Sequence, residues 1–202
     1  TSHPGPFNVL TSPHEHVVEN CIKDLSTHGE VFDLMNLSRT PYNKINIHIG
    51  GAYGDKVSSM ERFCTNFHRL PNSVKSRLTV ENDDKASMYS VVDLYEGVYK
   101  VIGIPIVFDY HHHRFCTGGL TEEDALEVAI STWVDIVPVV HYSESRNIEQ
   151  EDNKIRPQAH SDYVYDYIDT YGNRVDIMVE AKAKELAVLK YKEIHNDIRT
   201  NS

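Results

Sequence analysis

The sequence predicts an α/β fold, a (β/α)8 TIM barrel that is incomplete at its N-terminus. Short runs rich in Ile and Val alternate with helical patterns along all 202 residues, as in a parallel sheet with helical crossovers. The runs are apolar on consecutive residues, as expected of strands covered on both faces. About six β/α units are expected, the first strand cut short at Thr1, whereas a complete barrel takes about 250 residues. An open six-stranded sheet is the structural alternative.

Nearly every expected strand stops on a histidine or a carboxylate. The terminal residues of the six runs are His3, His48, Glu81, Asp109, His141 and Glu180. The C-terminal ends of parallel strands share one rim of a sheet, where barrel enzymes carry their active sites. The sequence therefore predicts that these side chains converge in a metal site.

Helical spacing separates the strands. Apolar residues recur at i, i+3, i+4 and i+7, in sets that begin at Val18, Met60, Val91 and Leu126. Thr121 and Asp124 open the fourth set with a capping-box-like start. A weaker last helix is expected from about Lys182 to His195, and the stretch from Tyr142 to about Asn173 is expected to be a functional or flexible loop.

The totals favour one soluble domain, residues 1–202, inside a cell. No apolar run approaches the ~20 residues that span a bilayer, so no membrane contact is expected. Three widely spaced cysteines without a CxxC pattern favour a reduced intracellular protein, cytoplasmic or, in a eukaryote, nuclear. Because the chain begins at Thr1 without a methionine, we expect a processed or truncated piece.

The net charge of −10 argues against a generic nucleic-acid coat, because polyanion binding normally needs clustered Lys and Arg. It leaves a nuclease open, because bound divalent cations would make the local potential positive.

The strand-end residues suit divalent metal ions. A salt bridge to Lys or Arg could explain Glu81 or Glu180 alone, but hardly both together with Asp109 and three histidines. Imidazole and carboxylate donors together suit Zn²⁺, Mn²⁺ or Fe²⁺. The set is large enough for two or three ions, which can ionise a water and neutralise a phosphate.

Three details stay open at this level. Spacing alone does not choose a ligand among His111, His112 and His113, and His160 lies far from any strand. The segment Gly50–Lys56 looks like a phosphate-holding loop but does not fit G-x-x-x-x-G-K-[ST].

Several segments together resemble the UV damage endonuclease family, relatives of the endonuclease IV type of abasic-site nuclease. They occur in order over nearly the whole chain: Ser2–Pro4, Ile47–Lys56, Val80–Asp84, Pro105–His112, His141–Ser143, His160–Tyr163, Val179–Lys182 and Lys184–Glu185. The resemblance implies a TIM barrel with up to three divalent ions, manganese being favoured and zinc the alternative. The implied ligands are His3, His48 and Glu81 for one ion; Glu81, Asp109, His141 and Glu180 for a second; and His112 with His160 for the third.

The resemblance also implies a reaction. A metal-activated hydroxide would hydrolyse the DNA phosphodiester 5′ to UV photoproducts, cyclobutane dimers and 6-4 products, leaving a 3′ hydroxyl. Glu81, Asp109 and Glu180 would be the catalytic carboxylates. The implied partner is damaged double-stranded DNA, contacted by Phe7, Lys56 and Tyr110, and a monomer is expected.

Two positions depart from the family pattern. Pro6 precedes Phe7 where the family usually has Gln before an aromatic residue, and Val139 stands where the family commonly has a lysine near the metals. The alternatives are an abasic-site endonuclease of the endonuclease IV type, a sugar isomerase on a similar barrel, and a truncated, inactive metal- or DNA-binding remnant.

Overall fold

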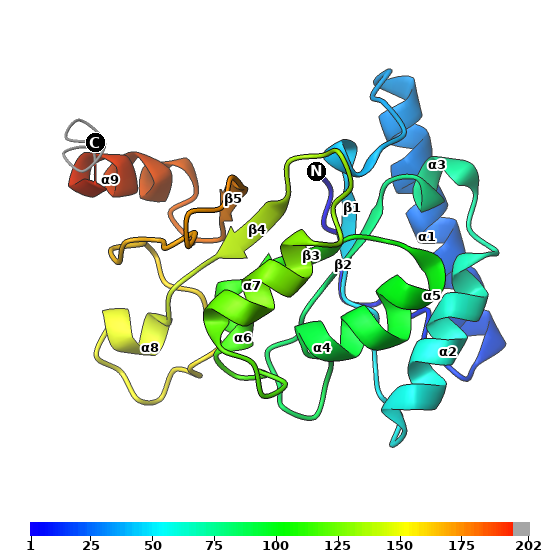
Figure 1. The fold of residues 1–202 in the computed structure, drawn as a ribbon, viewed down its shortest axis with the longest axis horizontal. Coiled ribbons are helices and arrows are strands. Elements are labelled where there is room, and N and C mark those ends of the chain that lie inside the picture. Colours follow the sequence, from blue (N-terminus) through cyan, green and yellow to red (C-terminus); the bar gives the residue numbers. More distant parts are fainter. Residues whose placement is uncertain (196–202) are drawn as a thin grey trace.

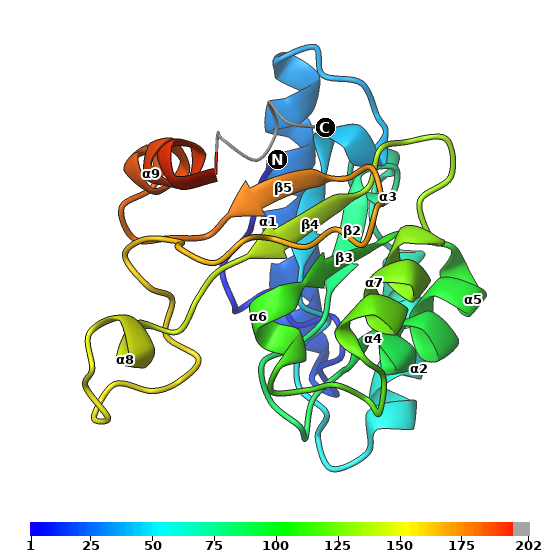
Figure 2. The same cartoon turned by 60° about the vertical axis from the view of Figure 1, so that its left-hand side comes forward.

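The computed structural model describes residues 1–195 and contains one all-parallel sheet of five strands in the order β1-β2-β3-β4-β5 (Figure 1). The strands are β1 (Ile45–Ile47), β2 (Leu78–Glu81), β3 (Ile106–Asp109), β4 (Val139–Tyr142) and β5 (Asp176–Val179). Each pairs with the next one along the chain, with a crossover between them, and Figure 2 shows the strands side by side. The predicted α/β class is confirmed, as a parallel half-barrel.

The expectation of a first strand ending at His3 is wrong. Ser2 makes only an isolated parallel bridge to Ile45, in which the Ser2 N–H donates to Lys44 O (2.8 Å) and the Asn46 N–H donates to Ser2 O (2.9 Å). Pro4 has no N–H to offer, so the ladder cannot continue past His3. The described residues therefore form five strands, and Ser2 adds an isolated bridge where a sixth strand was expected.

The helices follow the apolar spacing. They are α1 (Glu15–Leu34), the 3₁₀ turn η1 (Pro41–Asn43), α2 (Lys56–Phe67), α3 (Asn72–Lys75), α4 (Val91–Leu94), the π-helix η2 (Tyr95–Tyr99), α5 (Lys100–Ile102), α6 (Tyr110–His113), α7 (Glu122–Ile130), α8 (Arg146–Glu149) and α9 (Glu185–His195). The third predicted helix is thus continuous but contains a π-helical segment. The expected start of the last helix at Lys182 was too early, because Lys184 has φ of 53° and the helix begins at Glu185.

Two apolar clusters cover the two faces of the sheet. The larger one packs helices against the outer face and includes Leu25, Phe63, Leu94 and Leu126, and burying each such side chain contributes about 1.5–3 kcal/mol. The smaller cluster joins Val107, Trp133 and Val139. Burial on both faces explains the unbroken apolar runs in the sequence.

Alternation along the strands places the inner side chains in layers, as in other β/α barrels. At the C-terminal rim the inner side chains are His48, Glu81, Asp109 and His141, and two residues earlier on each strand a lower layer holds Asn46, Thr79, Val107 and Val139. The register shifts by two residues between β2 and β3, where Glu81 pairs with Val107, whereas Asn46 pairs with Thr79 and Asp109 with His141. Half of the lower layer is therefore polar and half is apolar. The valine at position 139 belongs to the apolar half, packed with Val107 and Trp133.

The long segment after β4 is largely irregular, as expected. It carries the single-turn helix α8, which stands away from the sheet in Figure 2. An antiparallel bridge between Ser145 and His160 returns the segment toward the rim. None of the helices over residues 1–195 has the length and apolar character that crossing a bilayer requires.

Candidate metal centre

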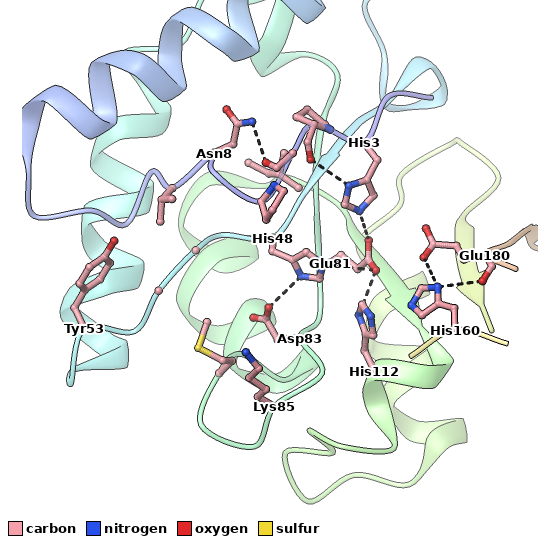
Figure 3. Close-up of a pocket in the computed structure, with 18 residues that line it drawn as sticks. His3, Asn8, His48, Tyr53, Glu81, Asp83, Lys85, His112, His160 and Glu180 are labelled. Atoms are coloured by element: carbon pink, nitrogen blue, oxygen red, sulfur yellow. Dashed lines mark hydrogen bonds and ion pairs between the residues drawn. The ribbon is translucent and has the colours of Figure 1, made fainter. Parts of the chain in front are cut away.

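Glu81, at the end of β2, lies at the centre of a histidine cluster (Figure 3). Its Oε2 lies 3.3 Å from His3 Nε2 and 3.2 Å from His141 Nδ1. Its Oε1 lies 3.3 Å from His112 Nδ1 and 4.0 Å from His48 Nε2. One carboxylate therefore faces imidazoles from the N-terminal segment and from the ends of three strands.

Glu180, just beyond β5, completes the cluster on its far side. Its Oε1 lies 3.1 Å from His141 Nδ1, and its Oε2 lies 3.6 Å from His160 Nδ1. The His160 ring also donates from Nδ1 to the Glu180 carbonyl at 3.0 Å. The loop after β4 thus returns His160 to the rim, although His160 lies outside any strand.

Asp109 is held by the start of α6. Its Oδ1 accepts the His112 N–H at 2.8 Å, and Asn82 bonds both its backbone N–H (2.8 Å) and its carbonyl (3.0 Å). This N-cap aims His112 at Asp109 and Glu81, with His112 Nδ1 3.9 Å from Asp109 Oδ2. His111 and His113 are buried away from these carboxylates, so the geometry singles out His112 within the triplet.

The described residues contain three groups of possible metal ligands, and within each group the ligand atoms lie within 4.8 Å of one another. They are His3, His48 and Glu81; Glu81, Asp109 and His112; and Asp109, His141 and Glu180. The first group is the expected one, and the third contains three of the four residues expected for the second ion. His160 belongs to none of the three groups, and its ring centroid lies 6.1 Å from that of His112. The pairing of His112 with His160 around one ion stays a prediction.

The charges in this cluster are balanced by imidazoles. Burial would raise the pKa of Glu81, but His141, His3 and His48 hold that pKa well below its usual value. Burial would lower the pKa of His48, but Asp83 and Glu81 raise it to about 9. In residues 1–195, no Lys or Arg lies within 4.0 Å of the carboxylates of Glu81, Asp109 or Glu180. Separate salt bridges to basic residues therefore do not account for these acids.

Asp109 behaves differently from Glu81. Burial raises the pKa of Asp109 to about 7, with only partial compensation by His112. Below it lies the apolar half of the lower layer, so no side chain there donates a hydrogen bond to its carboxylate. A nearby cation would restore its ionised form.

The donor atoms fit divalent ions. Glu81 Oε1, Asp109 Oδ2 and both ring nitrogens of His141 are buried without a hydrogen-bond partner, and each such atom costs about 1–3 kcal/mol if it stays unsatisfied. His112 and His160 direct Nδ1 to the backbone carbonyls of Asn82 (2.9 Å) and Glu180 (3.0 Å). This places the proton on Nδ1 and leaves Nε2 as a free donor atom, the usual arrangement of metal-binding histidines.

A second carboxylate supports His48 and was missed in the sequence. Asp83 Oδ1 lies 3.1 Å from His48 Nδ1, the geometry of an acid that orients a ligand histidine. Its position two residues after Glu81 could have suggested it, because alternation in a strand places i and i+2 on one face.

The ligands border a cavity of about 670 Å³. Its lining also includes Pro6, Gly51, Tyr53, Lys85 and Met88, of which Tyr53 and Lys85 are labelled in Figure 3. No pattern in the sequence marks Tyr53, Lys85 or Met88 as cavity residues.

In the segment Gly50–Lys56, the glycines allow close backbone packing beside the site. Gly50 has φ of +109°, and a Cβ there would collide with Val9, so this glycine lets the N-terminal loop pack onto the end of β1. Gly50 and Gly51 line the cavity, whereas Lys56 starts α2.

The three residues expected to touch DNA have different surroundings. Phe7 is 86% exposed beside the cavity residue Pro6. Lys56 Nζ forms an ion pair with Asp93 Oδ2 at 3.1 Å. Tyr110 is only 1% exposed and donates its hydroxyl proton to Asp169 O at 2.9 Å, so it is part of the core and does not face the cavity.

Comparisons with known proteins identify the family of the chain. A family model described as UV-endonuclease UvdE matches residues 1–200. A UV DNA damage endonuclease of Bacillus pumilus (strain SAFR-032) is 37% identical over 210 residues, which cover 98% of this chain and 62% of that protein. One of Bacillus cereus (strain Q1) is 37% identical over 201 residues, covering 94% of this chain and 59% of that protein. The chain therefore spans about three fifths of the length of these relatives.

Solved structures give the same result for the fold. The crystal structure of SacUVDE matches with a TM-score of 0.81 and 32% identity, over 98% of this chain and 65% of that one. A D-psicose 3-epimerase of Clostridium cellulolyticum H10 matches with a TM-score of 0.53 and 13% identity, over 70% of this chain and 50% of that one. The second similarity concerns the fold alone and supports a partial TIM barrel.

Proposed function

The chain belongs to the UV-endonuclease UvdE family, and on that premise we propose that it is the metal-binding part of a DNA repair endonuclease. The proposed reaction is hydrolysis of the phosphodiester 5′ to cyclobutane dimers and 6-4 products, leaving a 3′ hydroxyl. The observation that carries the proposal is the burial of Glu81 Oε1 and Asp109 Oδ2 without hydrogen-bond partners, close to the imidazoles of His48 and His112. Such a centre binds cations, and the relatives of similar sequence are named as nucleases of UV-damaged DNA.

The proposed ligands of the first two ions follow two of the groups of donor atoms, and those of the third follow the family resemblance. His3, His48 and Glu81 hold one ion, and Asp109, His141 and Glu180 hold a second that Glu81 also approaches through its contact with His141. His112 and His160 offer Nε2 to a third ion. Imidazole and carboxylate donors suit manganese and zinc alike, and manganese is proposed first because the family resemblance favours it.

Divalent ions at these positions would activate a water, neutralise phosphate charge and stabilise the leaving oxygen. The protein residues supply the rest. Glu81, Asp109 and Glu180 fix the negative charge that holds the ions, while Asp83 and the carbonyls of Asn82 and Glu180 fix the histidine rings. The buried position of Glu81 and Asp109 keeps bulk water from competing for their oxygens.

Double-stranded DNA with UV lesions is the proposed substrate. Phe7 is exposed next to the cavity residue Pro6 and can stack on an unstacked base. Lys56 can reach a phosphate if its ion pair with Asp93 opens. Tyr110 is buried in the core, so its proposed role is to support the rim by packing and not to contact DNA. We further propose that the chain acts as a single domain and as a monomer.

Cleavage assays test this proposal. UV-irradiated, abasic and undamaged duplexes of one sequence are incubated with the protein in Mn²⁺ and, separately, in chelator. The proposal expects cleavage of the irradiated duplex alone, 5′ to the lesion and only with metal. Faster cleavage of the abasic duplex would instead favour an abasic-site endonuclease, which Pro6 makes the second candidate because the usual glutamine is absent. Metal uptake without cleavage of any duplex would indicate an inactive remnant.

A further inference from the structure

Asn46 is a polar residue in the middle of the apolar strand β1 (Ile45–Ile47), and it is completely buried. It belongs to the layer directly beneath the metal cluster, where its register partner on β2 is Thr79. A buried amide is costly unless its hydrogen bonds are made. The contacts of this side chain therefore indicate why it is present.

Both ends of the Asn46 amide are engaged. The Thr79 hydroxyl donates to Asn46 Oδ1 at 2.8 Å, and Asn46 Nδ2 donates to Glu81 Oε2. Since a hydroxyl can donate to the amide oxygen while a carboxylate can only accept, the two contacts fix which way the amide points. Thr79, Asn46 and Glu81 thus form a directed chain of hydrogen bonds that ends at the central carboxylate.

The series of hydrogen bonds from Thr79 through Asn46 reaches only one oxygen of Glu81. Oε2 accepts the Asn46 amide proton, whereas Oε1 is buried without a hydrogen-bond partner and lies 3.3 Å from His112 Nδ1. The carboxylate plane is therefore set from below, with its two oxygens directed to different histidines. Asp109 lacks such support, because Val107 and Val139 occupy the lower layer on its side.

We propose that Asn46, oriented by Thr79, is a positioning residue that sets the Glu81 carboxylate so that it can serve two groups of metal ligands at once. The inference rests on the proposed function, because it requires that Glu81 binds metal. Asn46 itself contacts the carboxylate and no other member of the ligand groups in the described residues, so its effect passes through Glu81.

Mn²⁺ binding, measured by titration calorimetry without DNA, tests the inference. Asn46→Leu removes the amide at similar volume, and a lost ligand-orienting contact typically weakens metal binding about 10- to 100-fold. Thr79→Val removes only the donor behind Asn46, so a loss of about 2- to 10-fold is expected, the size of one hydrogen bond. The matched control is Asn66→Leu, since Asn66 is another buried asparagine whose amide donates to Leu10 O at 2.9 Å; its Mn²⁺ affinity should equal that of the unsubstituted chain.

A second comparison separates positioning from a general loss of structure. If Asn46 acts through Glu81, Asn46→Leu should weaken Mn²⁺ binding no further in a Glu81→Gln background. An independent loss in that background would overturn the inference, as would unchanged affinity in Asn46→Leu alone. If Asn46→Leu does not fold, judged by circular dichroism, unchanged affinity in folded Thr79→Val overturns it equally.

The outcome also distinguishes this inference from the proposed function. Failure of the unsubstituted chain to bind Mn²⁺ would overturn both. Tight binding that is insensitive to Asn46 and Thr79 would overturn the positioning role and leave the metal centre standing.

Discussion

Glu81 Oε2 and His141 Nδ1 lie 3.2 Å apart, although they belong to β2 and β4 and β3 lies between these strands in the sheet. The contact crosses the inner face of the half-barrel, where neither side chain meets a Lys or Arg among the described residues. Glu81 and Asp109 each belong to two of the three groups of ligand atoms, but Glu81 lies within 4.0 Å of four imidazoles and Asp109 of one. The Glu81 carboxylate is therefore the most connected member of the site.

Glu81→Gln should abolish cleavage while the fold is retained. The amide keeps the volume of the side chain but removes the charge that four imidazoles face. Cleavage of irradiated DNA and the manganese content of the purified protein should both fall, with the far-UV circular dichroism unchanged. An active variant with normal metal content would contradict the assignment of Glu81 as a shared ligand.

Asp83→Asn should weaken metal binding without abolishing it. Asp83 Oδ1 contacts His48 Nδ1 at 3.1 Å, and loss of such an orienting acid typically costs about 10- to 100-fold in affinity. Mn²⁺ titration measures the change. Asp84→Asn, at the next position along the chain but with no contact to His48, is the control and should bind normally; equal binding by both variants would count against the orienting role.

Metal binding should stabilise the folded chain. A ligand at 100 times its Kd adds about 2.7 kcal/mol to the free energy of unfolding, if the unfolded chain does not bind it. Mn²⁺ should therefore raise the Tm in a scanning-calorimetry experiment, and chelator should reverse the rise. The same addition should raise the Tm of Glu81→Gln by a smaller amount, because that variant lacks one shared ligand, and an equal rise would place the ions elsewhere.

The ion pair of Asp33 predicts a separate dependence of stability on pH. Arg39 and Arg77 lower the pKa of Asp33 to about 2, below the value of about 3.9 expected in the unfolded chain. The stabilisation is therefore present at neutral pH and is lost as the pH falls from about 4 toward 2. Urea unfolding should show a difference between the unsubstituted chain and Asp33→Asn at pH 7 that shrinks at pH 3.

Arg77 is the second basic partner of Asp33. Its guanidinium is completely buried and lies 2.8 Å from Asp33 Oδ1. The Asp33 carboxylate therefore neutralises a buried positive charge. Glu19→Gln, on the exposed side of the same helix α1, is the control and should not alter the pH dependence. A difference that is the same at both pH values would refute the role of Asp33.

The convergence of the ligands could be predicted because topology alone dictates it. Parallel strands bring their C-terminal residues to one rim, so β2, β3 and β4 could be expected to deliver Glu81, Asp109 and His141 together. The polar layer beneath was missed. Asn46 and Thr79 lie inside apolar runs, and only the register of β1 on β2 shows that they meet.

Other details depend on where local structure starts and stops. His112 could not be chosen from its two neighbours until the N-cap at Asp109 fixed the direction of the turn. The first strand was overestimated because periodicity cannot show that Pro4 ends the pairing. Tyr110 follows Asp109 directly in the sequence, yet the same turn directs it into the core.

Anomalous diffraction from crystals grown with Mn²⁺ tests the central claim most directly. The account predicts manganese peaks at the rim of the sheet, bound directly by His3, His48 and Glu81 and by Asp109, His141 and Glu180. A map without manganese at these carboxylates would contradict it, and so would one in which Glu81 is paired with a lysine or an arginine.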